Sequence, residues 1–164
     1  MRNFLLLLLI LIIFFGCTAK LGKQEQADLN NKLFIAMENG NFEDTKSLIE
    51  SGADINARSN EQYNETVLMI AAYWNEIEIV ELLLSKGADI NAMDESGWTA
   101  LMYAIVESNT AIIITLLADG ADVNTIIATQ STDNWPEGAT PLSIAEELEN
   151  STIINLLKEA GAEE

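Results

Sequence analysis

From about residue 30 to the end of the chain, apolar positions recur at the spacing of short amphipathic helices. Two segments show this most clearly, with apolar residues at Ile77, Ile79, Val80, Leu83 and Leu84 and again at Ile112, Ile113, Leu116 and Leu117. The spacing predicts helices that each bury one face. Shorter apolar segments follow Thr66, Thr99 and Thr140 and predict a second set of helices. The pattern therefore predicts a series of helix pairs.

Two short motifs recur in fixed phase along the same region. The first is Gly-Ala-Asp, then Ile or Val, then Asn, and it begins at Gly52, Gly87 and Gly120, with a shortened copy at Gly161. The second is Thr with Leu two residues later and Ala five residues later, and it begins at Thr66, Thr99 and Thr140, with a degenerate copy at Asn31. Self-similarity at a fixed period predicts stacked units that bury a core only together.

The residue types at the motif boundaries suit helix ends. The three threonines stand where a helix N-cap is needed, and Pro141 occupies the first helical position, where its missing N–H costs nothing. Each glycine of the first motif follows a predicted outer helix, where a left-handed residue is favoured. The small alanines of the second motif allow neighbouring helices to approach closely.

These motifs resemble the ankyrin repeat, and the resemblance covers residues 30–164. It implies an all-α solenoid of about four helix-turn-helix repeats with hairpin-like connections, at residues 30–60, 64–96, 97–129 and 138–164. The histidine of the family's Thr-Pro-Leu-His motif is absent from every copy, and its place is taken by Phe34, Met69, Met102 and Ser143. Packing is therefore expected to contribute more of the stability between repeats.

The connection before the fourth repeat is longer than the others. Its insertion covers residues 125–137 and is expected to extend the hairpin into a finger that contains Trp135. Loop insertions cost little free energy, so tolerated drift and a contact surface both explain it.

The N-terminus has a different pattern. Arg2 precedes an unbroken apolar run over residues 4–15, which is the layout of a secretory signal and shorter than the roughly 20 residues of a membrane-spanning helix. Residues 14–17, Phe-Phe-Gly-Cys, resemble the lipobox of bacterial lipoproteins, although Leu is usual at the place of Phe14. The resemblance implies a signal peptide over residues 1–16 and a lipid on Cys17. An uncleaved signal anchor is the alternative.

The segment that follows is polar. Residues 17–29 are therefore expected to form a lipidated tether ahead of the repeats. In either reading of the N-terminus the repeat domain is expected in the bacterial cell envelope, anchored to the inner or the outer membrane and facing the periplasm.

The composition of the chain limits which partners it can bind and which reactions it can catalyse. The chain has 26 acidic and 8 basic residues, a formal net charge of −18, which disfavours nucleic acid and favours a basic protein partner or simple solubility. It has no histidine and one cysteine, so the commonest general base and the commonest metal ligand are absent. The acidic run at Glu146, Glu147 and Glu149 is interpreted as a solvated face. The sequence therefore predicts no cofactor, no metal and no catalytic residue.

The resemblance implies that a partner binds along the concave face, which hairpin tips and the exposed side of the inner helices form. Aromatic residues are enriched at binding hot spots. The predicted strip contains all three tryptophans and two of the three tyrosines, and it consists of Tyr63, Glu65, Tyr73, Trp74, Met93, Glu95, Trp98, Val106, Glu107, Ile126 and Trp135. Tyr63 and Trp98 have the alternative role of covering a junction between repeats.

Four functions remain open. The first is a monomeric, membrane-anchored interaction module that holds a partner protein at the cell envelope. The second is an inhibitor or immunity protein whose acidic concave face blocks a basic exported enzyme or toxin. The others are an enzyme that uses carboxylates alone and a structural lipoprotein without a specific partner.

Overall fold

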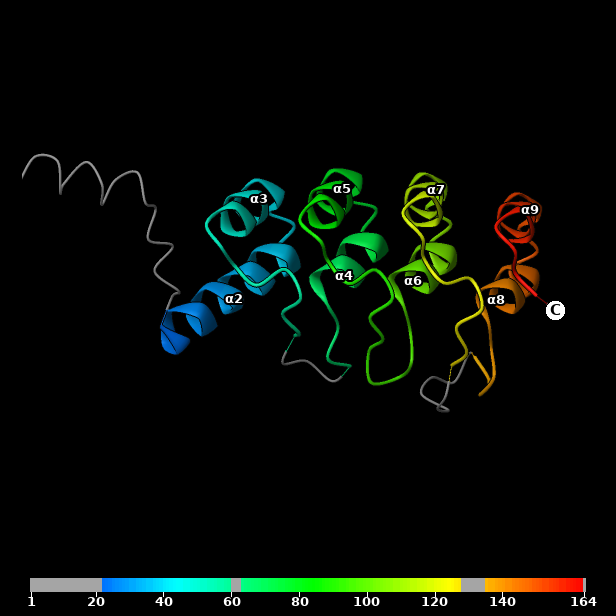
Figure 1. Ribbon diagram of the computed structural model, residues 1–164, viewed down its shortest axis with the longest axis horizontal. Helices are drawn as coiled ribbons and strands as arrows, with labels where there is room; N and C mark the ends of the chain where they lie inside the picture. Colours follow the sequence, from blue (N-terminus) through cyan, green and yellow to red (C-terminus); the bar gives the residue numbers. More distant parts are fainter. Residues whose placement is uncertain (1–21, 60–62, 128–134, 164) are drawn as a thin grey trace, which may run out of the picture.

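The computed structural model describes residues 22–59, 63–127 and 135–163, which form two rows of helices in one solenoid (Figure 1). The inner row consists of α2 (Lys23–Glu38), α4 (Val67–Tyr73), α6 (Ala100–Val106) and α8 (Pro141–Glu147). The outer row consists of α3 (Phe42–Glu50), α5 (Ile77–Ser85), α7 (Thr110–Ala118) and α9 (Ser151–Glu159). Each helix packs against its partner in the pair and against the next helix of its row. The predicted all-α repeat solenoid is confirmed.

The inner helices begin as the sequence predicts. The hydroxyl oxygens of Thr66, Thr99 and Thr140 accept hydrogen bonds from the backbone N–H three residues later. In two repeats the residue at the place of the missing histidine completes the cap. The N–H of Thr66 donates to the sulfur of Met69 over 3.3 Å, and the N–H of Thr140 donates to Oγ of Ser143 over 2.8 Å.

The outer helices end in a repeated left-handed turn. Gly87 has a φ of 85°, its N–H donates to the carbonyl of Leu84, and the N–H of Ala88 donates to the carbonyl of Leu83. These two bonds satisfy carbonyls that the end of the helix leaves unpaired. The glycines in the same place in the other pairs, Gly52, Gly120 and Gly161, also have positive φ. The predicted role of the motif glycines is confirmed.

The core runs without interruption through all four helix pairs. Ala71 and Ala104 of the inner helices are fully buried, which lets α4 and α6 lie close together. Met69 and Met102, which stand in for histidine, are buried in the same core. Apolar packing therefore occupies the space between repeats, as the loss of histidine predicts.

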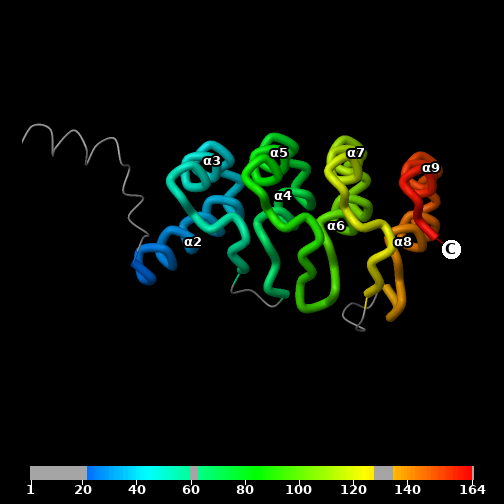
Figure 2. Tube along the Cα trace, in the orientation of Figure 1, coloured from blue at the N-terminus to red at the C-terminus, as the bar shows by residue number. Residues whose placement is uncertain are grey.

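The connections between repeats project on one side of the inner row (Figure 2). Each has backbone pairing across its base, from Ser59 N–H to Glu65 O at 2.8 Å and from Asp94 N–H to Trp98 O at 3.0 Å. In the long connection the N–H of Ile127 donates to the carbonyl of Ala139 over 2.9 Å. The base of the predicted finger is therefore a hairpin, while residues 128–134 lie outside the described residues.

The predicted tether over residues 17–29 needs correction, because α2 already begins at Lys23. Side chains one turn apart stabilise this start, with Gln24 donating to Asp28 and Gln26 to Asn30 over 3.0 Å each. Gln26 also donates to the carbonyl of Gly52, which ties the start of α2 to the first connection. The signal peptide and Cys17 lie outside the described residues. None of the helices that the structure describes is both long and apolar enough to cross a membrane.

Candidate partner-binding face

Two large aromatic side chains stand exposed where α4 ends. Tyr73 is the last residue of α4 and Trp74 is its C-cap, and their side chains are 43% and 55% exposed. The chain turns away at once because Asn75 adopts a left-handed conformation with a φ of 61°. An abrupt end of the inner helix therefore leaves both rings at the surface, as the sequence predicts for this strip.

These two rings begin a row of five aromatic rings that crosses from the second repeat to the long connection. We call this set the aromatic row, and in order it consists of Trp74, Tyr73, Tyr103, Trp98 and Trp135. Successive ring centroids lie 5.5, 6.3, 5.4 and 6.4 Å apart. These spacings are typical of attractive aromatic pairs.

Trp98 is not exposed, and its predicted place in the contact strip is corrected. Its side chain is only 6% exposed, and it packs between Tyr103 of α6 and Trp135 of the long connection. Its Nε1 has no hydrogen-bond partner within the described ranges. Trp98 covers the junction between repeats, which was the alternative that the sequence left open.

Tyr103 belongs to this face but is absent from the predicted strip. Its hydroxyl lies 2.8 Å from Oδ2 of Asp94 and 3.1 Å from Oε1 of Glu65, so it bridges two successive connections. Burial raises the pKa of Tyr103 well above its usual range, and the negative charges of Asp94 and Glu65 raise it further. The phenol therefore stays protonated and acts as a structural donor.

Asp94 fixes the hairpin that precedes α6. Its carboxylate is buried, and Oδ1 accepts from the N–H of Ser96 over 2.7 Å and from the N–H of Trp98 over 2.9 Å. Residues 94–97, Asp-Glu-Ser-Gly, are a turn signature in the sequence, so the role of Asp94 could have been predicted.

A groove opens between the first connection and the ends of the inner helices. It has a volume of about 240 Å³. We call it the concave groove, and it is lined by Glu38, Ser59, Glu65, Ile70, Tyr73, Trp74 and Tyr103. The structure thus brings Tyr73, Trp74 and Glu65 of the predicted strip to one site, and adds Glu38 and Tyr103.

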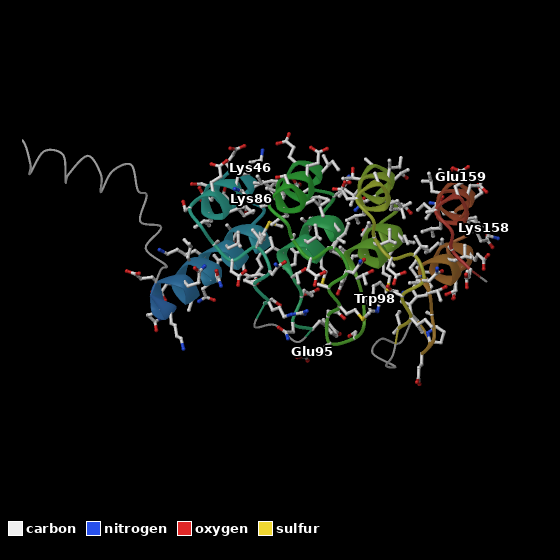
Figure 3. All side chains as sticks on the ribbon, viewed as in Figure 1. Lys46, Lys86, Glu95, Trp98, Lys158 and Glu159 are labelled. Carbon is white, nitrogen blue, oxygen red and sulfur yellow. The ribbon has the colours of Figure 1, made fainter. Side chains whose placement is uncertain are left out.

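The remaining strip residues differ in exposure. Met93, Glu95, Glu107 and Ile126 are exposed, whereas Tyr63, Val106 and Trp135 are half-buried. Glu95 lies on the hairpin side of the molecule, where Figure 3 also shows Trp98. Of the strip residues, all of which the structure describes, only Trp98 is buried.

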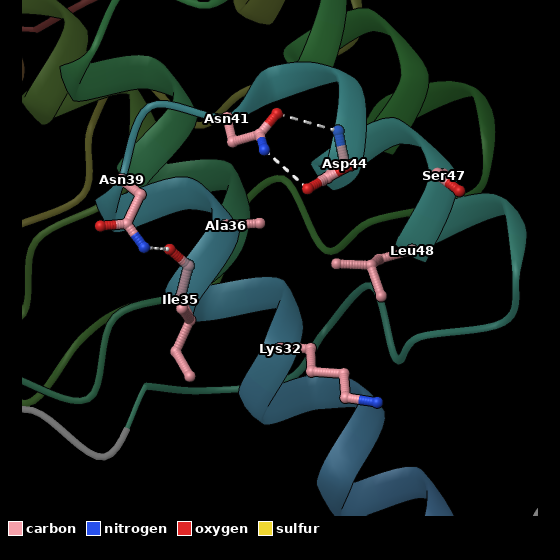
Figure 4. A pocket seen from close by; sticks show the side chains of 8 residues that line it. All are labelled: Lys32, Ile35, Ala36, Asn39, Asn41, Asp44, Ser47 and Leu48. Atoms are coloured by element: carbon pink, nitrogen blue, oxygen red, sulfur yellow. Dashed lines mark hydrogen bonds between the residues drawn. The ribbon is translucent and has the colours of Figure 1, made fainter.

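A second cavity, of about 370 Å³, lies on the first repeat between α2 and α3 (Figure 4). Its polar side chains satisfy local helix ends, since Asn39 donates to the carbonyl of Ile35 and Asn41 donates to Asp44. Within the described residues no cluster of three or more acidic or cysteine side chains could hold a metal ion.

Four stacked helix pairs joined by projecting connections define an all-α repeat solenoid in the described part of the chain. The model of ankyrin repeats, in three copies, matches residues 33–127, and the chain belongs to the ankyrin-repeat family. Proteins built from these repeats generally act as protein-interaction modules and not as enzymes.

Relatives share the repeats over limited lengths. The chain is 37% identical over 83 residues to an ankyrin repeat protein of Fowlpox virus (strain NVSL), covering 50% of this chain and 24% of the viral protein. It is 48% identical over 49 residues to the mitochondrial disaggregase of Bos taurus, covering 30% and 7%. It is 35% identical over 93 residues to ankyrin repeat and SAM domain-containing protein 6 of Rattus norvegicus, covering 56% and 10%. The chain therefore spans less than a quarter of the length of each of these relatives.

Proposed function

We propose that this protein is a membrane-anchored interaction module that holds a partner protein at the bacterial cell envelope through its concave face. The observation that carries the proposal is the exposure of Tyr73 and Trp74 beside the concave groove. Exposed neighbouring aromatic side chains are costly in water unless a partner covers them, and Trp and Tyr are frequent binding hot spots.

The anchor in this proposal is a lipid on Cys17, supported by the lipobox-like residues 14–17. Since α2 begins at Lys23, five residues separate the lipidated cysteine from the helix. Even fully extended, these residues reach about 18 Å. The first repeat is then held close to the bilayer, with the later repeats available to a partner.

An inhibitor or immunity protein is the second candidate, and the charge favours it. The chain has a net charge of −18, and Glu38, Glu95 and Glu107 are exposed at inner-helix ends and on a hairpin. Such a surface suits a basic enzyme or toxin. This candidate predicts nanomolar affinity that falls steeply with salt, and toxicity of the partner in cells that lack this protein.

Capture of envelope proteins by the purified full chain in nonionic detergent tests the proposal. The test variant is Tyr73→Ala with Trp74→Ala, and the control is Ile114→Ala on α7, whose side chain is 50% exposed on the outer row. Trp98 is left intact because its removal would open the core. We expect a partner that the wild type and the control capture and the double variant loses.

Two other results would contradict this proposal. Equal capture by all three proteins would move the binding site to the outer row or the long connection. No capture by any of them would favour a structural lipoprotein without a specific partner.

A further inference from the structure

The concave groove combines negative charge with aromatic surface. Glu38 contributes from the last turn of α2 and Glu65 from the first connection, while three aromatic rings line the groove beside Ser59 and Ile70. Carboxylates and the faces of aromatic rings both attract cations. The composition of the groove therefore selects for a positively charged group.

The rings are arranged at right angles and not as a flat stack. The plane of Tyr73 makes an angle of 87° with that of Trp74 and of 89° with that of Tyr103. Rings in perpendicular orientations present surface to the groove from different directions. A planar cation that stacks on one ring can therefore touch the edge or face of another.

No lysine or arginine among the described residues lines the concave groove. Lys46 pairs with Glu78 on the outer row, and Figure 3 shows Lys46 and Lys86 on the side opposite to Glu95 and Trp98. Arg58, next to the lining residue Ser59, donates to the backbone carbonyls of Asn64 and Met93 over 3.0 and 2.8 Å. Arg58 does not line the groove. In the described part of the chain, the carboxylate of Glu38 has no ion-pair partner.

The same junction in the next repeat lacks these features. Val106 and Glu107 end α6 at the places where Tyr73 and Trp74 end α4. The pair of exposed aromatic rings is thus specific to the end of α4, and the end of α6 provides a matched comparison within the same chain.

We propose that the concave groove binds one arginine side chain from an exposed segment of the partner protein. The inference rests on the proposed function and specifies the chemistry that the partner presents. Guanidinium is planar and weakly hydrated, so it stacks on aromatic rings and forms hydrogen bonds with carboxylates at the same time. The excess of negative charge on the chain draws such a partner toward the same face.

Two short probes test this assignment on the full chain in nonionic detergent micelles. They are N-acetyl-Gly-Arg-Gly-amide and the peptide with neutral citrulline in place of arginine, which has nearly the same shape. Binding is followed by the indole N–H signal of Trp74 in two-dimensional NMR, assigned with Trp74→Phe. We expect the arginine peptide to shift this signal saturably and the citrulline peptide to bind about tenfold more weakly.

Exposed carboxylates provide the matched variants. Glu38→Gln should weaken binding of the arginine peptide roughly threefold, the size typical of an exposed charge pair, whereas Glu107→Gln should leave it unchanged. Both residues are exposed at helix ends, so neither change disturbs the core.

Several results would overturn the assignment. They are equal binding of the two peptides, no shift of the Trp74 signal, or the same affinity in Glu38→Gln as in the wild type. Tighter binding of tetramethylammonium chloride than of the arginine peptide would assign the groove to a quaternary ammonium ligand instead. If the capture experiment succeeds and the arginine peptide does not bind, only this inference fails and the proposed function stands.

Discussion

Oδ1 of Asn91 accepts a hydrogen bond from the backbone N–H of Asp122, one repeat further along the chain, over 2.8 Å. The same bond joins Asn56 to Asp89 and Asn124 to Glu163, over 2.9 Å each. Within each motif the aspartate also accepts from the asparagine N–H two residues later, as Asp89 does from Asn91. The recurring Asp and Asn of the repeat motif therefore form a ladder that ties each connection to the next.

Asn91→Ala should lower the free energy of unfolding by about 1 kcal/mol, the usual worth of one hydrogen bond. The change removes the acceptor for Asp122 and leaves the core intact. Urea denaturation followed by far-UV circular dichroism measures the effect. Asn31→Ala is the control, because Asn31 is exposed on α2 and its side chain makes no hydrogen bond within the described residues. An equal effect of both changes would refute a role for the ladder.

The phenol of Tyr103 makes stability depend on pH in the alkaline range. Its pKa is raised in the folded protein by burial and by Asp94 and Glu65, whereas in the unfolded chain it ionises near pH 10. Below pH 10 the phenol is protonated in both the folded and the unfolded states, so the stability that the buried phenol contributes is fully present. Above pH 10 the unfolded state binds fewer protons than the folded state, so stability falls as pH rises.

Tyr103→Phe removes the group whose ionisation lowers stability above pH 10. We expect the urea midpoint of the wild type to fall more between pH 9 and pH 11 than that of the variant. At pH 7 the variant should be less stable by about 1 kcal/mol, because Asp94 loses a donor. Parallel pH profiles of the two proteins would show that Tyr103 ionises freely in the folded state.

Trp98 and Trp74 should respond to truncation in opposite ways. Trp98→Ala opens a cavity within the aromatic row and should cost roughly 3–5 kcal/mol of stability. Trp74→Ala removes an exposed side chain and should change stability by less than about 1 kcal/mol while weakening partner capture. Thermal unfolding together with capture of the envelope partner separates the two roles. Comparable destabilisation by both changes would place Trp74 in the core instead.

The proposed lipid on Cys17 can be detected by metabolic labelling. Cells fed with radioactive palmitate should label the wild-type chain, and Cys17→Ser should abolish the label because Cys17 is the only cysteine. Immunoblotting for the full-length chain checks that expression is unchanged. Retained label in Cys17→Ser would rule out lipidation at this position.

The parts of the fold that depend on neighbouring residues were predictable from the sequence. Thr66 caps a helix through a backbone N–H three residues away, and Gly87 ends one through bonds to the preceding turn. Motifs of a few residues contain all the information for such contacts. The helix pairs and their order follow from repeating these motifs.

Contacts between repeats were harder to predict. Trp74 and Trp98 are alike in residue type and in predicted location, yet one is exposed and the other buried. Burial of Trp98 depends on Tyr103 and Trp135, which belong to a different helix and a different connection. The ladder asparagines were missed for the same reason, because the motif shows their recurrence but not their acceptance of a bond from the next repeat.

Photocrosslinking in living cells tests most directly whether a partner protein binds the concave face. The photoreactive residue p-benzoylphenylalanine would replace Trp74 on the concave face and, as the matched control, Ile114 on the outer row, both of them exposed. We expect a discrete covalent adduct with one envelope protein from position 74 and none from position 114. An adduct from position 114 alone, or from neither position, would contradict a partner bound to the concave face.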